Sequence, residues 1–507
     1  MMHLDRRGFL ALATMTALAA AAEPLGAAAP DGLVVTTRQG RVRGRAVEGI
    51  RVFTGIPYGQ AQRFAAPLAL RPWRDVYDAT RPAAVAPQLP GMAKFEGAMS
   101  EDCLQLNVWA PATPGSYPVL VYIHGGGNET GWSGDQGTAG DRFAAHGVIC
   151  VTMNYRIGAF GFLETGGLLG RAYAGSANNG MRDVILALRW VRANIAAFGG
   201  DPTRVTLAGE SAGGKNVGTL MGMPAADGLY ARTALFSGGA QTVHTSTEAQ
   251  AFARLFADKL GGADRLATAP VAAMLAAQAA ARAAWPRNFP FRPMVDGRDL
   301  PDVPLARIRA GRAPRVPMLI GSNADESRLF LPAAAAQSPF REQSLSNETL
   351  ARMTALDGAY TRAFPDLSVA ERHWRLLTAE EYGMPCQRIA EGHSGSGGAV
   401  YRYRWTYPAA GGPFAGRSPH VIDVPFTFDH VQTSAFAGFF GLTAADQPMA
   451  DAVHQAMVRF VRDGQPVAAG LPAWQRYDAK ARQTMMLART PATLSDPDRV
   501  ERLIWTE

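Results

Sequence analysis

The sequence has little cysteine, and the few cysteines it has form no recognisable motif. Cys103, Cys150 and Cys386 are the three in a chain of 507 residues, so an odd number leaves at least one thiol unpaired. No CxxC, HExxH or other group with metal-ligand spacing occurs. We therefore expect neither a disulfide framework nor a bound metal.

Charged side chains are also sparse, at 18% of the residues, with a formal net charge of +7. A basic balance indicates nucleic-acid binding only where lysine and arginine cluster together. Here they are scattered, and the densest groups, residues 38–45 and 307–315, are typical of a solvated surface. No nucleic-acid partner is predicted.

Long hydrophobic runs are absent beyond the first residues, so no stable membrane anchor is predicted. Near the start, Arg6-Arg7-Gly8-Phe9-Leu10 leads into an apolar run, residues 11–22, that is short for a membrane span. This arrangement is typical of a signal peptide, and the arginine pair resembles a bacterial twin-arginine signal. We expect a leader over residues 1–22, cleaved there or as late as about residue 29, and an exported, periplasmic or secreted protein.

Short apolar runs alternate with helical patterns along the rest of the chain. Residues 119–123 are apolar throughout, as a buried central strand should be. Further strands are expected at residues 148–153, 205–208, 317–320 and 400–405. The alternation favours an α/β fold, with crossover helices joining the strands of a mostly parallel sheet.

Apolar residues at helical spacing predict the helices. One pattern runs from Met181 to Ile195 and stops at Gly199-Gly200, as a helix end often does. A further helix is expected near the C-terminus, with four apolar residues on one face: Val453, Met457, Phe460 and Val461. Residues of about 245–285 and 331–395 are also mainly helical in pattern, with 392–398 as a flexible loop. Since no linker or repeat appears, residues 32–507 are expected to form a single domain.

The segment Gly209-Glu210-Ser211-Ala212-Gly213 directly follows the strand expected at residues 205–208. It matches G-x-S-x-G, in which the serine stands on a sharp strand-to-helix turn and the glycines leave room beside it. Such a turn exposes the serine oxygen and directs the next N–H, that of Ala212, at a developing oxyanion. Ser211 is therefore the predicted nucleophile.

The same glycines also open a different motif. Residues 209–215 spell G-x-x-x-x-G-K, the start of a phosphate-binding P-loop, but Asn216 stands where that motif needs Ser or Thr to hold magnesium. The serine turn explains the glycines without a missing part. No nucleotide cofactor is predicted.

A second glycine-rich turn, His124-Gly125-Gly126-Gly127, follows the strand at residues 119–123. An HGGG turn of this kind supplies oxyanion-hole donors, because glycine lets backbone N–H groups approach the substrate closely. The alternative is a glycine-rich turn with no catalytic role. Two independent motifs in the right chain order argue against it. Gly126, Gly127 and Ala212 are the predicted donors.

These motifs resemble those of the type-B carboxylesterases, the family that contains acetylcholinesterase and bacterial para-nitrobenzyl esterases. The resemblance extends from about residue 32 to the C-terminus. Besides the two turns, it is carried by Glu101-Asp102-Cys103-Leu104, Asn107-Val108, Asn154-Tyr155-Arg156, residues 158–162, Asn194-Ile195, residues 198–202 and residues 291–297. It implies the α/β-hydrolase fold, with residues of about 245–285 and 331–395 as cap helices over the site, and hydrolysis of a carboxylic ester without a cofactor.

The resemblance also implies a triad in the order serine, acid, histidine, usually with glutamate as the acid. Residues 321–326 follow a predicted strand and resemble the acid-bearing turn, so Glu326 is the expected acid and Asp325 the alternative. Relatives usually have glycine next, where this chain has Ser327. Residues 418–426 resemble the histidine loop, which makes His420 the expected base. The other histidines after the acid are expected to be structural, namely His373, His393, His430 and His454.

Departures from the family concern the substrate site and one cysteine. Asn128 stands where many relatives have an aromatic residue, and its amide is expected to bond either the substrate or its own loop. Glu210 resembles a family acid that tunes the site, the alternative being a buried structural carboxylate. Four aromatic residues are expected either to line the substrate site or to belong to the core: Trp132, Phe289, Phe291 and Phe330. Relatives often pair the cysteine of the Glu101–Leu104 motif with an earlier one, but no cysteine occurs here around residues 86–88, so Cys103 is expected to be free or otherwise paired.

Three functions remain open at this point. The first is a serine carboxylesterase for small to medium esters, working through an acyl-enzyme. The second is a hydrolase dedicated to one aromatic, carbamate or toxin ester. The third is a non-catalytic esterase-like binding protein, against which the presence of Ser211, Glu326 and His420 argues. The oligomeric state stays open.

Overall fold

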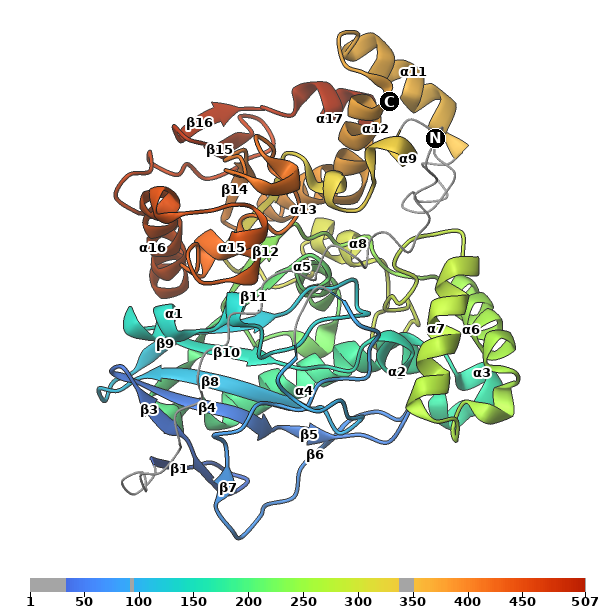
Figure 1. Cartoon of the computed structure of the whole chain (residues 1–507), viewed down its shortest axis with the longest axis vertical. Helices are drawn as coiled ribbons and strands as arrows, with labels where there is room; N and C mark the ends of the chain where they lie inside the picture. Colours follow the sequence, from blue (N-terminus) through green and yellow to red (C-terminus); the bar gives the residue numbers. More distant parts are fainter. Residues whose placement is uncertain (1–32, 92–94, 337–350, 507) are drawn as a thin grey trace. The chain divides into compact units, whose positions relative to one another are not determined.

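A mixed sheet of eleven strands organises the computed structural model, which describes residues 33–91, 95–336 and 351–506 (Figure 1). In spatial order its strands are β16 (Ala492–Ser495), β15 (Gln483–Leu487), β14 (Val400–Trp405), β13 (Met318–Asn323), β12 (Arg232–Phe236), β11 (Gly200–Glu210), β9 (Tyr117–Ile123), β10 (Ile149–Met153), β8 (Gln105–Pro111), β4 (Ile50–Pro57) and β3 (Arg45–Val47). Neighbours from β15 to β10 pair in parallel, whereas both edges of the sheet are antiparallel. This is the α/β-hydrolase arrangement predicted from the sequence.

Two small sheets and many helices complete the described chain. The small sheets comprise β1 (Val34–Thr36), β2 (Arg41–Arg43) and β7 (Tyr77–Asp78), and β5 (Gly59–Gln60) and β6 (Leu68–Ala69). The helices are α1 (Asp141–Ala145), α2 (Gly158–Phe162), α3 (Gly166–Leu169), α4 (Asn179–Asn194), α5 (Ala212–Leu220), α6 (Ser246–Leu260), α7 (Val271–Ala284), α8 (Pro304–Arg309), α9 (Ala333–Ala336), α11 (Met353–Ala363), α12 (Val369–Thr378), α13 (Met384–Gly395), α14 (Val424–Thr427), α15 (Ala435–Phe439), α16 (Gln447–Asp463) and α17 (Arg499–Thr506). A π-helical turn, η8 (Ala379–Gly383), joins α12 to α13, and a 3-10 turn, η7 (Glu326–Leu329), follows β13.

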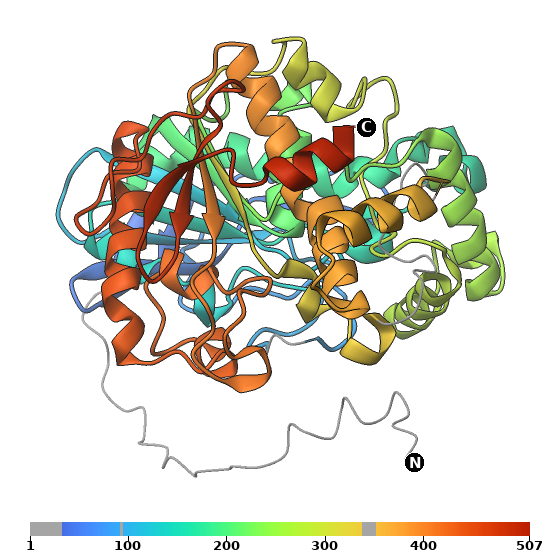
Figure 2. The ribbon, with the colours of Figure 1, turned by 90° about the horizontal axis from the view of Figure 1, so that it is seen from above.

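The core lies on both faces of the sheet because successive side chains of a strand point to opposite faces. In β9, Val119 and Val121 pack on one side with α4 and α5, whereas Leu120 and Tyr122 pack on the other with α16. Figure 2 shows α16 (orange-red) and the pair α6 and α7 (yellow-green) at opposite sides of the view. Being covered on both faces, the central strands consist of apolar residues without a polar alternation.

The predicted strands and helices are found close to their expected places. Residues 119–123, 148–153, 205–208, 317–320 and 400–405 all fall in or at the edge of strands of the main sheet. The helical patterns over 245–285 and 331–395 correspond to α6 and α7, and to α9 and α11–α13 where the chain is described. The expected loop at 392–398 is wrong in its first half, because α13 continues to Gly395. Gly392 packs closely against Arg309 of α8 there, so its lack of a side chain serves helix packing.

All three cysteines are buried and free. The prediction that Cys103 has no earlier partner is thus confirmed, and Cys150 is a buried residue of β10, as expected. The described residues from Leu33 onward form one compact unit. Within the described ranges, no helix is both long and apolar enough to cross a membrane. The expected leader, residues 1–22, lies outside the described residues and stays a prediction.

Candidate active site

Ser211 stands at the sharp turn between β11 and α5. Its backbone is left-handed, with φ 57° and ψ −123°, a conformation that is strained for any residue with a side chain. A Cβ on Gly209 would lie 2.4 Å from the carbonyl carbon of Gly213, and one on Gly213 would lie 2.0 Å from Ile123 O. The two glycines are therefore required by the tight crossing of the backbone, as the G-x-S-x-G pattern predicts.

Glu326 begins η7, immediately beyond the end of β13, and is fully buried. Its Oε1 accepts hydrogen bonds from Ser237 Oγ, at 2.6 Å, and from Asn323 N, at 2.7 Å. Its Oε2 lies 2.5 Å from His420 Nδ1. Burial and three hydrogen bonds thus orient this carboxylate toward the imidazole.

Asp325, the alternative acid, points elsewhere. Its carboxylate accepts a hydrogen bond from Ser418 N, at 2.9 Å, and pairs with Arg328 at 3.0 Å. Its own N–H donates to Ser418 O, so the residue joins the acid turn to the histidine loop by two bonds. Of the two neighbouring acids, the structure therefore brings only Glu326 to His420.

His420 is buried between two carboxylates. Its Nδ1 faces Glu326, and its Nε2 lies 3.2 Å from Glu210 Oε1. Within the described residues, Nε2 forms no hydrogen bond with good geometry, to Ser211 or to any other group. Such bonds are often loose in a free enzyme and tighten when substrate is bound.

Burial and charge shift the pKa values of this pair in a defined way. Burial raises the pKa of Glu210 to about 8, although the nearby His420 charge opposes the shift. For His420, burial lowers the pKa, but the charges of Glu210 and Glu326 outweigh burial and leave the pKa raised. Each of the two groups thus binds its proton more tightly than it would in water.

The remaining histidines after the acid have structural surroundings, as expected. Each places a ring nitrogen against a backbone carbonyl: His373 against Ala336, His393 against Val316, His430 against Ala139 and His454 against Thr427.

The HGGG turn lies directly beside the serine. A Cβ on Gly125 would lie 2.9 Å from Glu210 O and 3.1 Å from Ser211 Cβ. Gly126 and Gly127 have positive φ values of 105° and 66°. In the described part of the chain, the N–H groups of Gly126, Gly127 and Ala212 donate no hydrogen bond to the protein. Three unpaired donors near one nucleophile are the requirement of an oxyanion hole.

The side chain of Asn128 is engaged within the protein. Its amide nitrogen donates to Phe291 O at 3.1 Å, and its oxygen accepts from Asn216 at 2.9 Å and from Tyr155 at 3.3 Å. These bonds reach residues outside the loop, so the structure does not form the bond within the loop, and a bond to substrate stays a prediction. The residue ties the HGGG turn to the segment around residue 291.

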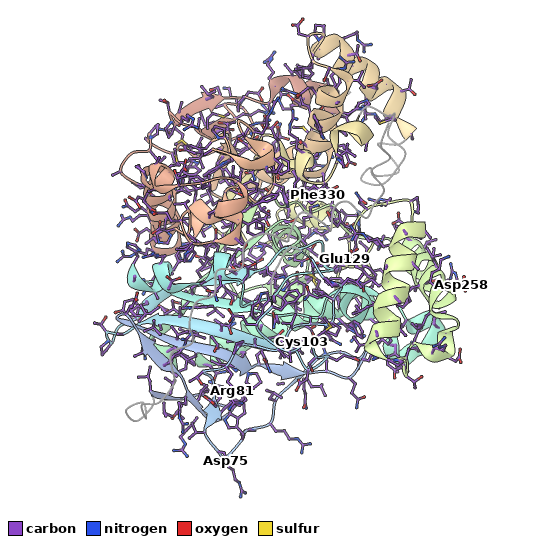
Figure 3. All side chains as sticks on the ribbon, viewed as in Figure 1. Asp75, Arg81, Cys103, Glu129, Asp258 and Phe330 are labelled. Atoms are coloured by element: carbon purple, nitrogen blue, oxygen red, sulfur yellow. The ribbon has the colours of Figure 1, made fainter. Side chains whose placement is uncertain are left out.

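The four aromatic candidates divide between the site and the interior. Phe330 lies with its ring centroid 5.0 Å from that of His420, and Phe289 lies 5.8 Å from Phe330. Phe291 is fully buried against Phe252 in the main core cluster, and Trp132 is 2% exposed. Figure 3 labels Phe330, just beyond the turn that carries Glu326, and Glu129, which follows the HGGG turn.

Several residues near the site have no individual signal in the sequence. Tyr382, from the π-helical turn η8, has its ring tilted against that of His420, with centroids 4.8 Å apart. Lys215, one turn into α5, forms an ion pair with Glu381 of the same π-helical turn. Ser237, which follows β12, orients Glu326. Ser327 adopts an ordinary 3-10 conformation and bonds Thr378, so the glycine usual there in relatives is not needed for a positive φ.

Comparison with known proteins agrees with this geometry. The model of the carboxylesterase family matches residues 31–503. A para-nitrobenzyl esterase of Bacillus subtilis is 32% identical, covering 92% of this chain and 97% of its own. A fumonisin B1 esterase of Sphingopyxis macrogoltabida is 31% identical, covering 94% and 90%. Among solved structures, a carboxylesterase of Geobacillus stearothermophilus superposes with a TM-score of 0.82 at 34% identity, over 93% of this chain and 99% of that one.

Proposed function

The chain belongs to the carboxylesterase family and is a carboxylic ester hydrolase, and from this premise we propose that Ser211, Glu326 and His420 are its catalytic triad. The observation that carries the proposal is the buried Glu326–His420 pair beside a serine held at a strained turn. With Nδ1 bonded to Glu326, Nε2 is the ring nitrogen of His420 that is left to take the Ser211 proton.

In the proposed mechanism, His420 Nε2 takes the Ser211 proton as Oγ attacks the ester carbonyl. Glu326 holds the imidazole tautomer and stabilises the imidazolium. The N–H groups of Gly126, Gly127 and Ala212 hold the tetrahedral oxyanion. His420 then protonates the leaving alcohol, and a water molecule attacks the acyl-enzyme by the same steps to release the acid and free Ser211.

For the substrate, we propose small to medium carboxylic esters. The rings of Phe289, Phe330 and Tyr382 crowd the approach to His420, which supports a compact substrate over a long acyl chain. The same aromatic wall also suits an ester with an aromatic part, so a hydrolase dedicated to one such ester is the second candidate.

The test is hydrolysis of a short series of 4-nitrophenyl esters by the wild type and by Ser211→Ala. The variant is expected to lose about a millionfold in kcat, because the nucleophile acts as a unit with its base. A serine-directed phosphonate should label the wild type at Ser211. Ser116→Ala, at an exposed position between β8 and β9, is the matched control and should keep full activity. A folded wild type that neither hydrolyses these esters nor takes the label would contradict the triad.

A further inference from the structure

Lys215 is a buried ammonium one helical turn beyond the nucleophile. The backbone N–H of Lys215 donates to Ser211 O at 2.9 Å, so the Cα of Lys215 lies about 5 Å further along α5. The residue is 6% exposed. In the sequence it appears only as the end of an incomplete P-loop pattern, and the proposed mechanism does not use it.

The ammonium of Lys215 has hydrogen-bonding capacity that the protein leaves unused. A lysine carries three N–H donors. Among the described residues its one acceptor is Glu381 Oε1. Beyond that partner, Nζ lies over two aromatic rings, 4.7 Å from the centroid of Tyr382 and 6.0 Å from that of Phe289. Two donors thus face apolar rings in a site from which bulk water is largely excluded.

Those two rings locate the ammonium relative to the reacting groups. Tyr382 contacts the His420 ring, with centroids 4.8 Å apart. Phe289 contacts the HGGG turn, since a Cβ on Gly127 would lie 2.5 Å from the ring. Lys215 Nζ therefore lies between the side of the site that holds the base and the side that holds the oxyanion donors.

The surroundings of this position favour an anion. Arg282 lies over the same Phe289 ring, at 5.8 Å, while paired with Glu129. Arg292, 3% exposed, donates to Phe289 O at 2.8 Å and keeps the ring in place.

We propose that Lys215 binds a carboxylate of the substrate, and that the enzyme prefers esters whose acyl or alcohol part carries one. The spacing along α5 places this carboxylate roughly one helical turn, about 5 Å, from the scissile carbonyl. Lys215 stays paired with Glu381, and the substrate carboxylate accepts from the unused donors. The inference rests on the proposed function of Ser211, because it concerns selectivity at the same site.

A purely structural role explains these contacts less well. A buried ion pair contributes little net stability, and apolar side chains of similar volume would join α5 to η8 at least as firmly. A structural contact would also affect all esters alike. Selectivity for charge on the substrate is therefore the property that separates the two roles.

The experiment compares esters that differ only in that charge. Monoethyl succinate is paired with ethyl succinamate for the acyl side, and acetoxyacetate with acetoxyacetamide for the alcohol side. Proton release is followed in a pH-stat at pH 7.5, after activity on 4-nitrophenyl acetate has been verified. The readout is the ratio of kcat/KM for the carboxylate to kcat/KM for its amide.

We expect the wild type to favour the carboxylate of one pair by about ten- to a hundredfold, the usual effect of a charge-assisted hydrogen bond. Lys215→Met should bring that ratio to about one or below. Glu381→Gln, which keeps the ammonium and removes its counter-charge, should raise the ratio. Because the two variants change the ratio in opposite directions, Glu381→Gln decides the matter if Lys215→Met does not fold. Arg254→Met, which removes an exposed cation of α6, is the control and should keep the ratio.

Each other outcome overturns the inference. A wild-type ratio near or below one for both pairs, a ratio that Lys215→Met leaves unchanged, or an equal loss in Arg254→Met would exclude Lys215 as the carboxylate site. So would a ratio that does not rise in Glu381→Gln. In these cases hydrolysis of 4-nitrophenyl acetate still supports the esterase function, whereas a folded enzyme inactive on every ester contradicts that function itself.

Discussion

His420 is the residue whose behaviour depends most on its neighbours. It lies between Glu326, which accepts from Nδ1, and Glu210, whose Oε1 is 3.2 Å from Nε2. Burial alone would lower the pKa of His420, but the two carboxylates reverse the direction. Since only the neutral imidazole can take the serine proton in the proposed mechanism, these acids would decide the pH range in which the enzyme works.

At this scale we predict that Glu210→Gln moves the acidic limb of the kcat/KM profile to lower pH. The sign follows from removing a negative charge that raises the pKa of His420, so that the imidazole becomes neutral at a lower pH. The measurement is the pH profile of 4-nitrophenyl acetate hydrolysis between pH 4 and 9. The control is Glu391→Gln, which should leave the profile unchanged. Glu391 lies on α13 and forms a half-buried ion pair with Arg482. An acidic limb that stays in place or moves upward would show that Glu210 does not act on His420.

At the scale of elements, three segments meet at the HGGG turn. The turn lies against the β11–α5 junction through Gly125, against the ring of Phe289 through Gly127, and against Phe291 O through Asn128. Phe289 itself has a positive φ of 51° and is held by Arg292. The proposed oxyanion donors are therefore oriented by a loop more than 160 residues further along the chain.

We predict that Gly127→Ala lowers kcat by about a hundred- to a thousandfold, the usual loss of one oxyanion donor. The new methyl group would lie 2.5 Å from the Phe289 ring at a position with φ 66°, so the N–H must turn away from its present direction. The change should fall on kcat more than on KM, measured on 4-nitrophenyl esters. Gly167→Ala is the matched control, because that glycine lies in α3 with open space around it, and it should retain full activity. Unchanged kcat in a folded Gly127→Ala would remove this N–H from the proposed oxyanion hole.

At the scale of the whole molecule, a buried ionic cluster secures the C-terminal edge of the sheet. Asp498 stands just before α17 and is 2% exposed. It pairs with Arg402, at 2.5 Å, and with Arg404, which both lie on β14. Although burial raises the pKa of Asp498, the charges of Arg404 and Arg402 outweigh burial and lower it to about 2. A carboxyl with a lowered folded-state pKa stabilises the fold above its ordinary pKa and loses that effect as the pH falls through the folded value.

We predict that Asp498→Asn lowers the free energy of unfolding by about 3–5 kcal/mol at pH 7, because it leaves two buried or half-buried guanidinium groups without their counter-charge. Urea denaturation followed by circular dichroism measures this loss. In the wild type, the contribution of about 2 kcal/mol from the lowered pKa should disappear between roughly pH 4 and pH 2. Asp463→Asn, in an exposed pair with Arg459, should change stability by less than about 0.5 kcal/mol. Equal stability of both variants at pH 7 would contradict a structural role for the cluster.

The sequence by itself determined the features that depend on local chemistry. The apolar runs specify the central strands, because a strand covered on both faces tolerates few polar residues. The glycines around Ser211 and in the HGGG turn specify two backbone conformations that other residues rarely adopt. These short-range requirements leave recognisable patterns, and they were sufficient for the fold and for the nucleophile that we propose.

Only the tertiary structure decided what depends on direction and on distant contacts. Asp325 and Glu326 are neighbours on one turn, and their different orientations separate the acid that meets His420 from the one that bonds Ser418. Likewise Phe289 lies at the site and Phe291 in the core, two residues apart, because a loop with a positive φ turns them to different sides. Lys215 acquires its partner from residue 381, across 166 positions of the chain. Such contacts arise when the sheet assembles and leave no periodic pattern in the sequence, so they can be identified only in the folded molecule.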